Sequence, residues 1–413
     1  MGPKNTVNKN ENDNRKAEVI GVSNKKKNIL IVHNYYQIPG GEDTVVANEK
    51  KMLEEHGHKV ILYSRNNAEL KELSLLKKLI LPVTTIFNPK TYKEIKSLIK
   101  AEDIDIVHVH NTLNLISPAV YYASYAMHIP VVQTVHNFRL LCPGAMFYRD
   151  GHICEVCMEN GLWCAIKHKC YRGSRVQTLA CVMSTWFHRM TGIYGKINYI
   201  CLTEFNREKL LNLKQIKPGK VFVKPNFVES EDSFNLGENQ KNQFIFVGRL
   251  DKLKGIDILF EAWKRMGDTA PNLSVCGTGP MESWCKSFIH QNQVNIEIRG
   301  FVPNEEVRKM IANSKALVLA TQLYEGFPMS IVEAFSVGTP VICSDFGNAG
   351  SVVDEGITGY KFECKSIESI IAAVEKMKKN PLDREKIKEL YEMKYSENAN
   401  YEILNDIYTS IND

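Results

Sequence analysis

Short apolar runs alternate with helix-like segments along almost the whole chain, and this alternation restricts the fold more than any other feature. Each run is rich in Val and Ile and apolar on both faces, as strands covered by helices on both sides should be. The runs cover residues 28–33, 59–64, 104–110, 130–136 and 197–203, and then 243–250, 272–279, 294–301, 315–321 and 340–345. The pattern predicts an α/β protein with two doubly wound, Rossmann-like domains that face each other across a cleft.

A polar, turn-rich stretch over residues 220–243 separates the two halves and is typical of a linker. We therefore expect one domain over residues 28–224 and a second over residues 225–391. Residues 1–27 are rich in Asn and Lys, lack an apolar segment, and are predicted to be a disordered extension. In doubly wound sheets ligands bind outside the carboxyl ends of the strands, so candidate site residues are sought there.

The charge of the chain is divided unevenly between the halves. Residues 28–226 carry a net charge of +9, from 25 Lys and Arg against 16 Asp and Glu, and residues 227–413 carry −8, from 20 against 28. A basic domain can face nucleic acid or an anionic membrane surface. With no signal peptide and no run of 18 apolar residues, we expect a cytoplasmic chain, peripheral on the inner face of the cell membrane.

Two candidate positions follow strands of the first half. Gly40 and Gly41 precede a helix expected to begin near Glu42 or Asp43, where a bulky anion could approach the backbone and the positive end of the helix dipole. His136 closes the run over residues 130–136, which points it toward the cleft. An ordinary glycine turn and a structural histidine are the respective alternatives.

Strand ends of the second half supply cations and glycines. Arg249 and Lys254 follow the run over residues 243–250, and two converging cations there suit a diphosphate. Solvated surface charge is the alternative for a Lys-rich loop. The sequence Gly277-Thr278-Gly279-Pro280 follows the next strand at the same edge.

The stretch YEGFPMSIVEAF, residues 324–335, places Glu325 and Glu333 on either side of a turn into a helix that begins near Met329. The first N–H groups of such a helix can hold a phosphate. Glu333, about one turn inside the helix, can accept hydrogen bonds from ribose hydroxyls, and Glu325 from hydroxyls of a sugar ring. A simple helix-capping role for Glu325 is the alternative.

Taken together in this order, these strand-end features resemble glycosyltransferase family 4, whose members are retaining enzymes of GT-B fold. The resemblance covers roughly residues 28–400. It implies that the second domain binds a nucleotide sugar, and it implies a C-terminal helix over residues 392–413 that crosses back to the first domain. Its most specific parts are Arg249-x4-Lys254 and Glu325-x7-Glu333 with the internal Gly-Phe-Pro.

The resemblance also implies roles. Arg249 and Lys254 would hold the diphosphate, Glu333 the ribose, and His136 would lie beside the donor sugar. The nucleotide base would lie near residues 299–302. His136, Arg249, Lys254 and Glu325 are the expected catalytic residues, and the expected donor-binding residues are Gly40, Gly41, Asn226, Gly277, Thr278, Gly279, Gly326, Phe327, Pro328, Met329, Ser330 and Glu333. No metal is expected in catalysis, because two cations and a helix dipole would replace it.

One departure from the family pattern concerns the domain junction. The family often has Pro-Asn-Gly-Val-Asp there, whereas this chain has Pro225-Asn226-Phe227-Val228-Glu229. Phe lacks the backbone freedom of Gly. Of the donor-binding roles that the resemblance implies, that of Asn226 is therefore the least supported.

Two further segments carry their own expectations. Cys142, Cys154, Cys157 and Cys170 form a C-x2-C pair with outlying cysteines, which suits a structural zinc; free thiols, Cys164 among them, are the alternative. Residues 71–100 contain seven Lys, two Glu and several Leu and Ile. They suit a basic amphipathic surface on an anionic bilayer, with a solvated helical pair as the alternative.

The sequence thus predicts a retaining glycosyltransferase that moves a hexose or deoxyhexose from a nucleoside-diphosphate sugar to a lipid-linked saccharide. The amino-acid sequence of residues 33–67 also resembles that of bacterial capsule rhamnosyltransferases. This resemblance suggests dTDP-rhamnose as the donor and a role in cell-surface polysaccharide synthesis. The rival functions are a nucleotide-sugar epimerase of GT-B fold and a non-catalytic partner that binds nucleic acid or membrane. Nucleic acid is not expected as a partner, because no aromatic stacking motif is present.

Overall fold

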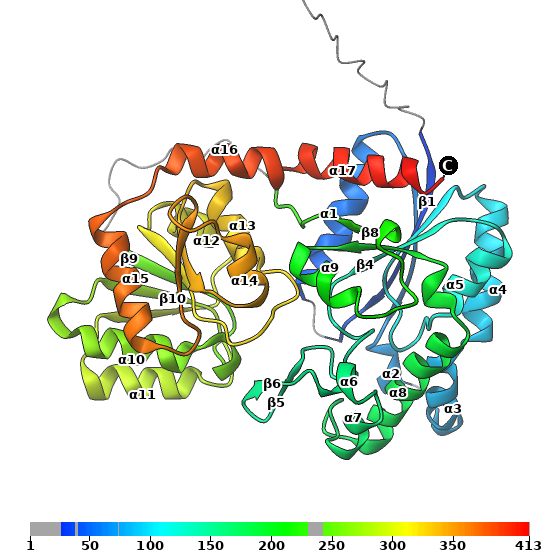
Figure 1. The fold of residues 1–413 in the computed structure, drawn as a ribbon, viewed down its shortest axis with the longest axis horizontal. Helices are drawn as coiled ribbons and strands as arrows, with labels where there is room; N and C mark the ends of the chain where they lie inside the picture. The colour runs from blue at the N-terminus through cyan, green and yellow to red at the C-terminus, as the bar shows by residue number, and fades with distance from the viewer. Residues whose placement is uncertain (1–25, 38–39, 73, 230–242, 413) are drawn as a thin grey trace, which may run out of the picture.

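The computed structural model describes residues 26–37, 40–72, 74–229 and 243–412, which form two α/β domains lying side by side (Figure 1). Each domain is built on a six-stranded sheet in which all neighbouring strands are parallel. The prediction of two doubly wound sheets is confirmed.

The N-terminal sheet has the strand order β2-β1-β3-β4-β7-β8. Its strands are β1 (Asn28–Tyr35), β2 (Lys59–Asn66), β3 (Ile106–Asn111), β4 (Val131–Val135), β7 (Asn198–Cys201) and β8 (Val221–Val223). One face packs against α1 (Gly41–Glu55) and α17 (Glu397–Ser410), and the other against α4 (Pro89–Ala101) and α5 (Ala119–Ala126). Helix α9 (Glu204–Leu210) follows β7.

The N-terminal domain carries a long excursion between β4 and β7. It contains a small antiparallel hairpin, β5 (Tyr148–Arg149) and β6 (His152–Ile153), followed by α6 (Val156–Glu159), α7 (Cys164–Lys167) and α8 (Arg175–Met190). Helix α8 packs against α3 (Leu75–Ile86), which follows the short α2 (Glu69–Glu72). The hairpin extends toward the C-terminal domain, where Lys365 Nζ donates to the Gly151 carbonyl over 2.9 Å (Figure 1).

The C-terminal sheet has the order β11-β10-β9-β12-β13-β14. Its strands are β9 (Gln243–Val247), β10 (Asn272–Cys276), β11 (Ile296–Gly300), β12 (Ala316–Leu319), β13 (Val341–Ser344) and β14 (Gly359–Phe362). Helices α10 (Ile256–Met266), α11 (Glu282–Asn292) and α15 (Ile367–Lys379) cover one face. Helices α12 (Asn304–Ala312), α13 (Met329–Ser336), α14 (Gly347–Val352) and α16 (Arg384–Lys394) cover the other.

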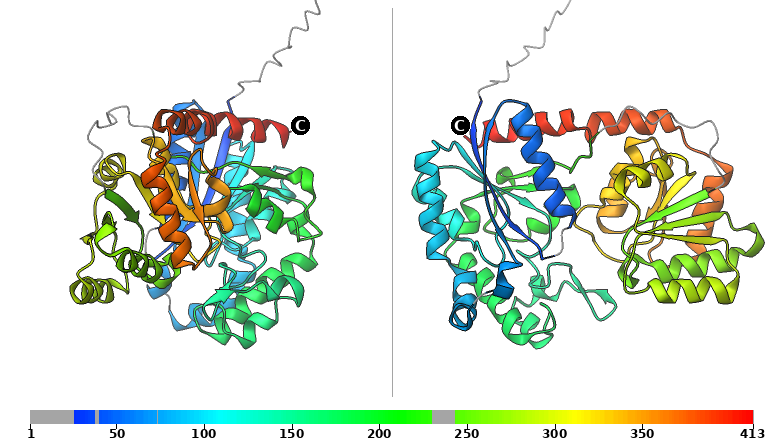
Figure 2. Two further views of the ribbon diagram at one scale, coloured as in Figure 1. Left: turned by 60° about the vertical axis from the view of Figure 1, so that its left-hand side comes forward. Right: turned by 180° about the vertical axis from the view of Figure 1, so that it is seen from behind.

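The chain crosses between the domains twice. At the first crossing two consecutive residues enter different cores: Phe227 packs in the N-terminal core with Tyr401 and Leu404, and Val228 packs in the C-terminal core. At the second crossing α16 leads into α17, which lies along the N-terminal domain (Figure 2). The hydroxyl of Tyr408 on α17 lies 2.7 Å from Nδ1 of His108 on β3.

Three details differ from the sequence-based expectations. The stretch 220–243 was expected to be only a linker, but it contains β8, a three-residue edge strand too short to show a pattern; residues 230–242 lie outside the described part. Strand β14, also short and at an edge, was missed. Residues 1–25 lie outside the described residues as well, but Lys27 is buried and its N–H donates to His58 Nδ1 over 3.1 Å, so it belongs to the folded domain.

Candidate active site

A partly buried ion pair involves Glu325, in the loop that follows β12. Lys254 Nζ lies 2.7 and 2.9 Å from the two carboxylate oxygens of Glu325, and the hydroxyl of Thr321 donates to Oε1 of Glu325 over 2.6 Å. The Glu325 side chain is only 11% exposed. The structure therefore brings together two of the four expected catalytic residues, 71 positions apart in the sequence.

Arg249 joins this pair through Asp251. The Arg249 Nε lies 3.2 Å from Asp251 Oδ2, and Asp251 Oδ1 accepts a hydrogen bond from the Lys254 backbone N–H over 3.0 Å. Arg249 itself is 68% exposed, so its guanidinium is accessible to a ligand. An exposed cation beside a more buried one is an arrangement that can neutralise a diphosphate.

The turn between Glu325 and α13 has the form expected from the sequence. Glu325 adopts a left-handed conformation with φ of 54°, which a non-glycine residue adopts only where its surroundings enforce it. Pro328 precedes the helix, and α13 begins at Met329 with Ser330 next. Burial raises the pKa of Glu333, against the opposing effects of Arg308 and a hydrogen bond with Asn304.

The two domains meet at Gly326. A Cβ added to Gly326 would lie 2.3 Å from the carbonyl oxygen of His136, so the two backbones are in direct contact and only glycine fits. The expected donor-sugar residues of the two domains are therefore adjacent.

Side chains that the sequence analysis did not single out hold this contact in place. The Asn348 side-chain amide donates to the carbonyls of Glu325 and Gly326, each over 2.8 Å, and Asn206 on α9 donates to Gly326 over 3.0 Å. Asn348 also bonds with Asn206 and Thr203 of the N-terminal domain. Asn348 lies just after β13, and its position at a strand end was the one signal that could have singled it out.

His136 is partly buried and lies beside a group of buried histidines. Its Nε2 lies 3.0 Å from His110 Nδ1, and the His110 ring stacks on that of His108. Burial, reinforced by neighbouring His33 and His108, lowers the pKa of His136 to about 3, and burial lowers the pKa of His110 well below its ordinary value. His136 is therefore a neutral hydrogen-bonding group at neutral pH.

The glycine pair is shaped by Asp43. Asp43 accepts hydrogen bonds from the Gly40 N–H over 3.0 Å and lies 2.8 Å from His33 Nε2. Helix α1 begins at Gly41, one residue earlier than expected. Among the described residues, a Cβ added at Gly40 or at Gly41 would meet no atom within 4 Å, so none of them requires glycine there. A ligand that approaches the backbone would supply such a requirement.

A cavity at the ends of β9 and β10 collects the remaining donor-binding candidates. Gly248, Arg249, Gly277 and Thr278 line it together with Phe301 and Val302. Phe301 is 79% exposed, and its ring is available for stacking. Gly277 and Gly279 have a structural reason to be glycine, because an added Cβ would lie 1.9 Å from Gly248 O and 2.4 Å from Leu250 O respectively.

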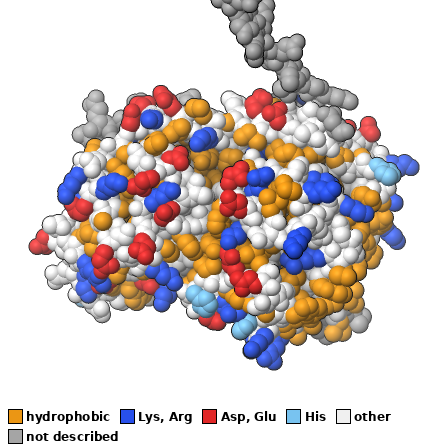
Figure 3. All heavy atoms as spheres, viewed as in Figure 1, with side chains coloured by type: hydrophobic (Ala, Val, Ile, Leu, Met, Phe, Trp, Pro, Cys, Tyr) orange, Lys and Arg blue, Asp and Glu red, His pale blue; other side chains and the backbone are white. Residues whose placement is uncertain are grey.

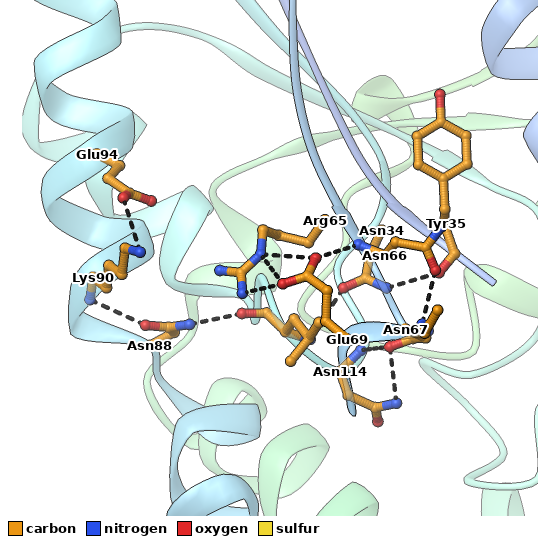
Figure 4. A network of polar contacts seen from close by, with 12 residues as sticks. Asn34, Tyr35, Arg65, Asn66, Asn67, Glu69, Asn88, Lys90, Glu94 and Asn114 are labelled. Atoms are coloured by element: carbon orange, nitrogen blue, oxygen red, sulfur yellow. Dashed lines mark hydrogen bonds and ion pairs between the residues drawn. The ribbon is translucent and has the colours of Figure 1, made fainter. Parts of the chain in front are cut away.

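A second cavity extends from His136 into the N-terminal domain. Its walls come from the end of β3, the segment after β4 and helix α8, and include His110, Thr112, Tyr121, Arg139, Cys181 and Thr185. Asparagines fix the loop that forms one wall: Asn67 contacts Asn114, and Asn88 Nδ2 donates to Leu115 O over 2.7 Å (Figure 4). We name it the acceptor-side cavity, for the role considered under Proposed function.

The other predicted residues are placed as follows. Asn226 is buried at the crossing, and its Oδ1 has no hydrogen-bond partner among the described residues. Phe327 packs at the edge of the C-terminal core. Of the predicted cysteine ligands, Cys157 lies 3.4 Å, sulfur to sulfur, from Cys164, which the predicted set leaves out. Within the part of the chain that the structure describes, no three cysteine sulfurs lie close enough together to bind one metal ion.

Three ligand atoms of Glu49, His108 and His110 do lie within 4.8 Å of one another. However, the ammonium of Lys224 lies 3.6 Å from Glu49, and both ring nitrogens of His108 are in contact with hydroxyls, those of Tyr408 and Thr134. The charge of Glu49 is thus already balanced, and we interpret this group as a buried polar network.

Comparisons with known proteins agree with this architecture. Residues 39–232 match the family described as Glycosyltransferase Family 4, and residues 228–392 match the family described as Glycosyl transferases group 1. An uncharacterized glycosyltransferase of Methanocaldococcus jannaschii, MJ1178, is 26% identical over 371 residues, which cover 88% of each chain.

Solved structures share the fold. The apo lipopolysaccharide outer core galactosyltransferase WaaB aligns with a TM-score of 0.65 and 16% identity over 93% of this chain and 99% of its own. Anabaena Alr3699/HepE in complex with UDP-glucose aligns with a TM-score of 0.61 and 14% identity over 93% of this chain and 100% of its own.

The chain is therefore a glycosyltransferase of GT-B fold. More narrowly, its N-terminal domain carries the family 4 match and its C-terminal domain the group 1 match. In the part of the chain that is described, no helix combines the length and apolar character needed to cross a bilayer.

Replacing Gly41 by Ala tests whether a ligand requires the glycine. The substitution should leave the melting temperature unchanged, since the added methyl group meets open space, but should raise KM for the donor by about tenfold through a clash with the diphosphate. Gly219→Ala is the matched control, because its Cβ also meets no atom within 4 Å. Unchanged donor KM in Gly41→Ala would show that the glycine pair is an ordinary turn.

The buried histidines predict an acid-sensitive fold. Burial lowers the pKa of His33, His108, His110 and His136. Below about pH 6.5 the unfolded chain therefore binds protons that the folded chain does not, and stability falls by up to about 1.4 kcal/mol per pH unit per histidine. Melting temperatures should be level from about pH 7 to 8 and fall steeply between about pH 6.5 and 5.

His110→Gln should flatten this decrease, whereas His290→Gln, an exposed histidine on α11, should not. A melting temperature that stays constant down to about pH 5 would contradict this reading.

Proposed function

We propose that this chain is a retaining glycosyltransferase that moves a sugar from a nucleoside-diphosphate sugar to a lipid-linked saccharide. The observation that carries the proposal is the contact of Gly326 with His136, which places Lys254 and Glu325 of one domain beside the acceptor-side cavity of the other. Donor and acceptor groups would then meet at one point of the interface.

The charge layout supports a specific order of bond changes. Arg249, Lys254 and the first turn of α13 stabilise the leaving diphosphate as the bond from the anomeric carbon to its phosphate oxygen breaks. The acceptor hydroxyl attacks the same face and passes its proton to a diphosphate oxygen, so configuration is retained. Glu325 orients the sugar hydroxyls, and neutral His136 can donate to the sugar without adding charge. These cations make the proposed chemistry independent of a metal ion.

The donor is proposed as a hexosyl or deoxyhexosyl nucleotide. The UDP-glucose of the Alr3699/HepE complex and the galactosyltransferase name of WaaB support a nucleoside-diphosphate hexose. The similarity to capsule rhamnosyltransferases favours dTDP-rhamnose. With a deoxyribose, Glu333 would meet only the 3′-hydroxyl, so its importance would differ between the two donors.

The acceptor and its setting are proposed as part of bacterial cell-surface polysaccharide synthesis, at the cytoplasmic face of the membrane. The basic character of residues 28–226, with a net charge of +9, supports contact with an anionic bilayer that holds a lipid-linked acceptor.

The experiment that tests the function is release of nucleoside diphosphate from a panel of nucleotide sugars, with and without lipid-linked saccharides. Release from one donor, increased by the lipid, would establish the transfer and name base and sugar together. Conversion of the donor into an epimer without acceptor would favour an epimerase. Intact donors throughout would favour a non-catalytic partner.

The role of the cations predicts a matched set of variants. Lys254→Ala and Arg249→Ala should each lower kcat by about 10²–10³, the effect of losing a donor that stabilises developing negative charge. Lys252→Ala, an exposed lysine in the same turn as Lys254, should retain wild-type turnover. Near-normal rates in both Lys254→Ala and Arg249→Ala would contradict the proposal that these two cations bind the leaving diphosphate.

A structural zinc in the excursion after β4 is proposed alongside. Cys142 and Cys170 flank Gly144, whose added Cβ would lie 3.7 Å from the sulfur of Cys142, and Cys157 contacts Cys164. Four thiolates of Cys142, Cys154, Cys157 and Cys170, with Cys164 as a rival ligand, would close around an ion. The segment they hold has few buried residues of its own, so an added constraint would stabilise it.

Such an ion would also matter for the active site. Glu155, between Cys154 and Cys157, pairs with Lys209 over 2.6 Å and interacts with Tyr324, the neighbour of Glu325. The protein as isolated should contain about one zinc per chain, and Cys157→Ser should lose it, whereas Cys364→Ser, outside the cluster, should not. Elemental analysis that finds under roughly 0.2 zinc per chain would reject the site.

A further inference from the structure

Exposed apolar side chains gather on one face of the N-terminal domain. They are Leu79, Ile80 and Val83 on α3, Val176, Leu179, Trp186, Phe187 and Met190 on α8, and Trp163 beside α7. Leu79, Val83, Val176 and Met190 are 67–76% exposed. We name this set the α3/α8 face. Figure 3 shows hydrophobic side chains concentrated at the lower right, where Figure 1 draws these helices. Scattered single apolar residues are ordinary on a surface, but a contiguous patch indicates a binding face.

The α3/α8 face is one rigid surface. His188 Nε2 on α8 lies 2.8 Å from the Ile86 carbonyl on α3, and the rings of Trp163 and Trp186 lie 6.2 Å apart. On α8 the exposed residues recur at helical spacing, while Thr178, Cys181, Val182, Ser184, Thr185 and His188 of the opposite side are buried. The apolar side chains are therefore fixed in place and face outward by the construction of the helix pair.

Basic residues predominate in the segments that carry this face, and the exposed Glu72 and Glu159 lie at their borders. Between Glu159 and Glu204 the sequence has six Lys or Arg and no acidic residue, and between Glu72 and Glu94 it has four Lys and again no acid. Lys78, Lys167, Lys169, Arg172 and Arg175 are exposed. A cationic rim with exposed tryptophans suits the headgroup region of an anionic bilayer. A second copy of the chain would bring the same cations together and is disfavoured.

The buried side of the same helices leads to the active site. Cys181, Ser184 and Thr185 of α8 line the cavity that contains His136. A neighbouring cavity between α3 and α8 is lined by Leu81, Pro82, Val176 and Ala180, and Cys181 forms a wall of both. Thr85 of α3 donates to the carbonyl of Asn114 in the loop that borders the acceptor-side cavity. Helix α8 therefore presents the outer face on one side and lines the cavity that contains His136 on the other.

We propose that the α3/α8 face docks on an anionic bilayer, with α3 and α8 lying in the interface, and that a lipid-linked acceptor reaches His136 through the cavities beside Cys181. The passage of the acceptor rests on the proposed transferase function, whereas docking does not. The sequence analysis placed the membrane-binding surface in residues 71–100, which include α3 and α4. In the structure α4 buries Thr91, Ile95 and Ile99 against the protein. The proposed surface therefore pairs α3 with α8 instead of α4.

The test of docking needs no sugar chemistry. The full chain is sedimented with phosphatidylcholine vesicles that contain either no or about one third phosphatidylglycerol. The wild type should bind the anionic vesicles more tightly, and added salt should weaken this binding. The variant Leu79→Ser/Ile80→Ser/Val83→Ser/Met190→Ser should bind about tenfold or more weakly, since four apolar side chains no longer leave water. Its melting temperature should be unchanged because these positions are exposed.

Met393→Ser/Ile357→Ser is the matched control, because it removes exposed apolar side chains from the C-terminal domain, and it should bind vesicles like the wild type. Docking is overturned if the wild type fails to sediment with anionic vesicles at low salt, or if the fourfold variant sediments equally well. It is also overturned if light scattering shows that the wild type is a dimer and the fourfold variant a monomer. That result would mean that the face binds a second copy of the chain.

Measurements of turnover distinguish membrane docking from passage of the acceptor through this face. The fourfold variant should retain wild-type nucleoside diphosphate release with a detergent-dispersed acceptor and lose it at least about tenfold with the acceptor in vesicles. Equal activity of wild type and variant on vesicle-borne acceptor would overturn the route through this face. If no donor is ever cleaved, the transferase proposal fails, and vesicle binding still decides docking.

Discussion

The contact between the carbonyl of His136 and the backbone of Gly326 is the constraint on which the site depends. It joins the ends of β4 and β12, one from each sheet, and allows no side chain between them. Asn348 reinforces it by bonding to Gly326 on its own domain and to Asn206 and Thr203 on the other. Glu325, the neighbouring residue, adopts a left-handed conformation and pairs with Lys254, so the contact also positions these two side chains relative to the N-terminal domain.

Much of this arrangement could be predicted from the sequence, because parallel sheets reveal their binding edge. Each strand that ends in a glycine, a cation or a histidine delivers that residue to the same edge, so Arg249, Lys254, Glu325 and His136 could be singled out before their distances were known. The beginning of α13 at Met329 followed from the Gly-Phe-Pro turn. Both sheets were identified, since their central strands are continuous apolar runs without a charged residue.

The remainder depends on contacts that leave no local pattern. Strands β8 and β14 have three and four residues and lie at sheet edges, so they show no periodicity. Asn348 looks like any polar residue after a strand, and its importance appears only where two domains meet. The exposed side of α8 was missed for a similar reason: an apolar pattern does not reveal whether it is buried, and only the folded helix pair shows Val176, Leu179 and Met190 in solvent.

The unequal charges of the two domains gain a physical meaning from the proposed docking. A bilayer that attracts the N-terminal half, with its net charge of +9, repels the C-terminal half, with −8. The domains are linked by the adjacent residues Phe227 and Val228 and by α16 leading into α17, so the C-terminal domain could remain in water while the α3/α8 face lies in the interface. A water-soluble nucleotide sugar would then bind on the aqueous side, and the lipid-linked acceptor would enter from the membrane side. The two substrates would enter by separate routes and meet between His136 and Glu325, where the proposed transfer takes place.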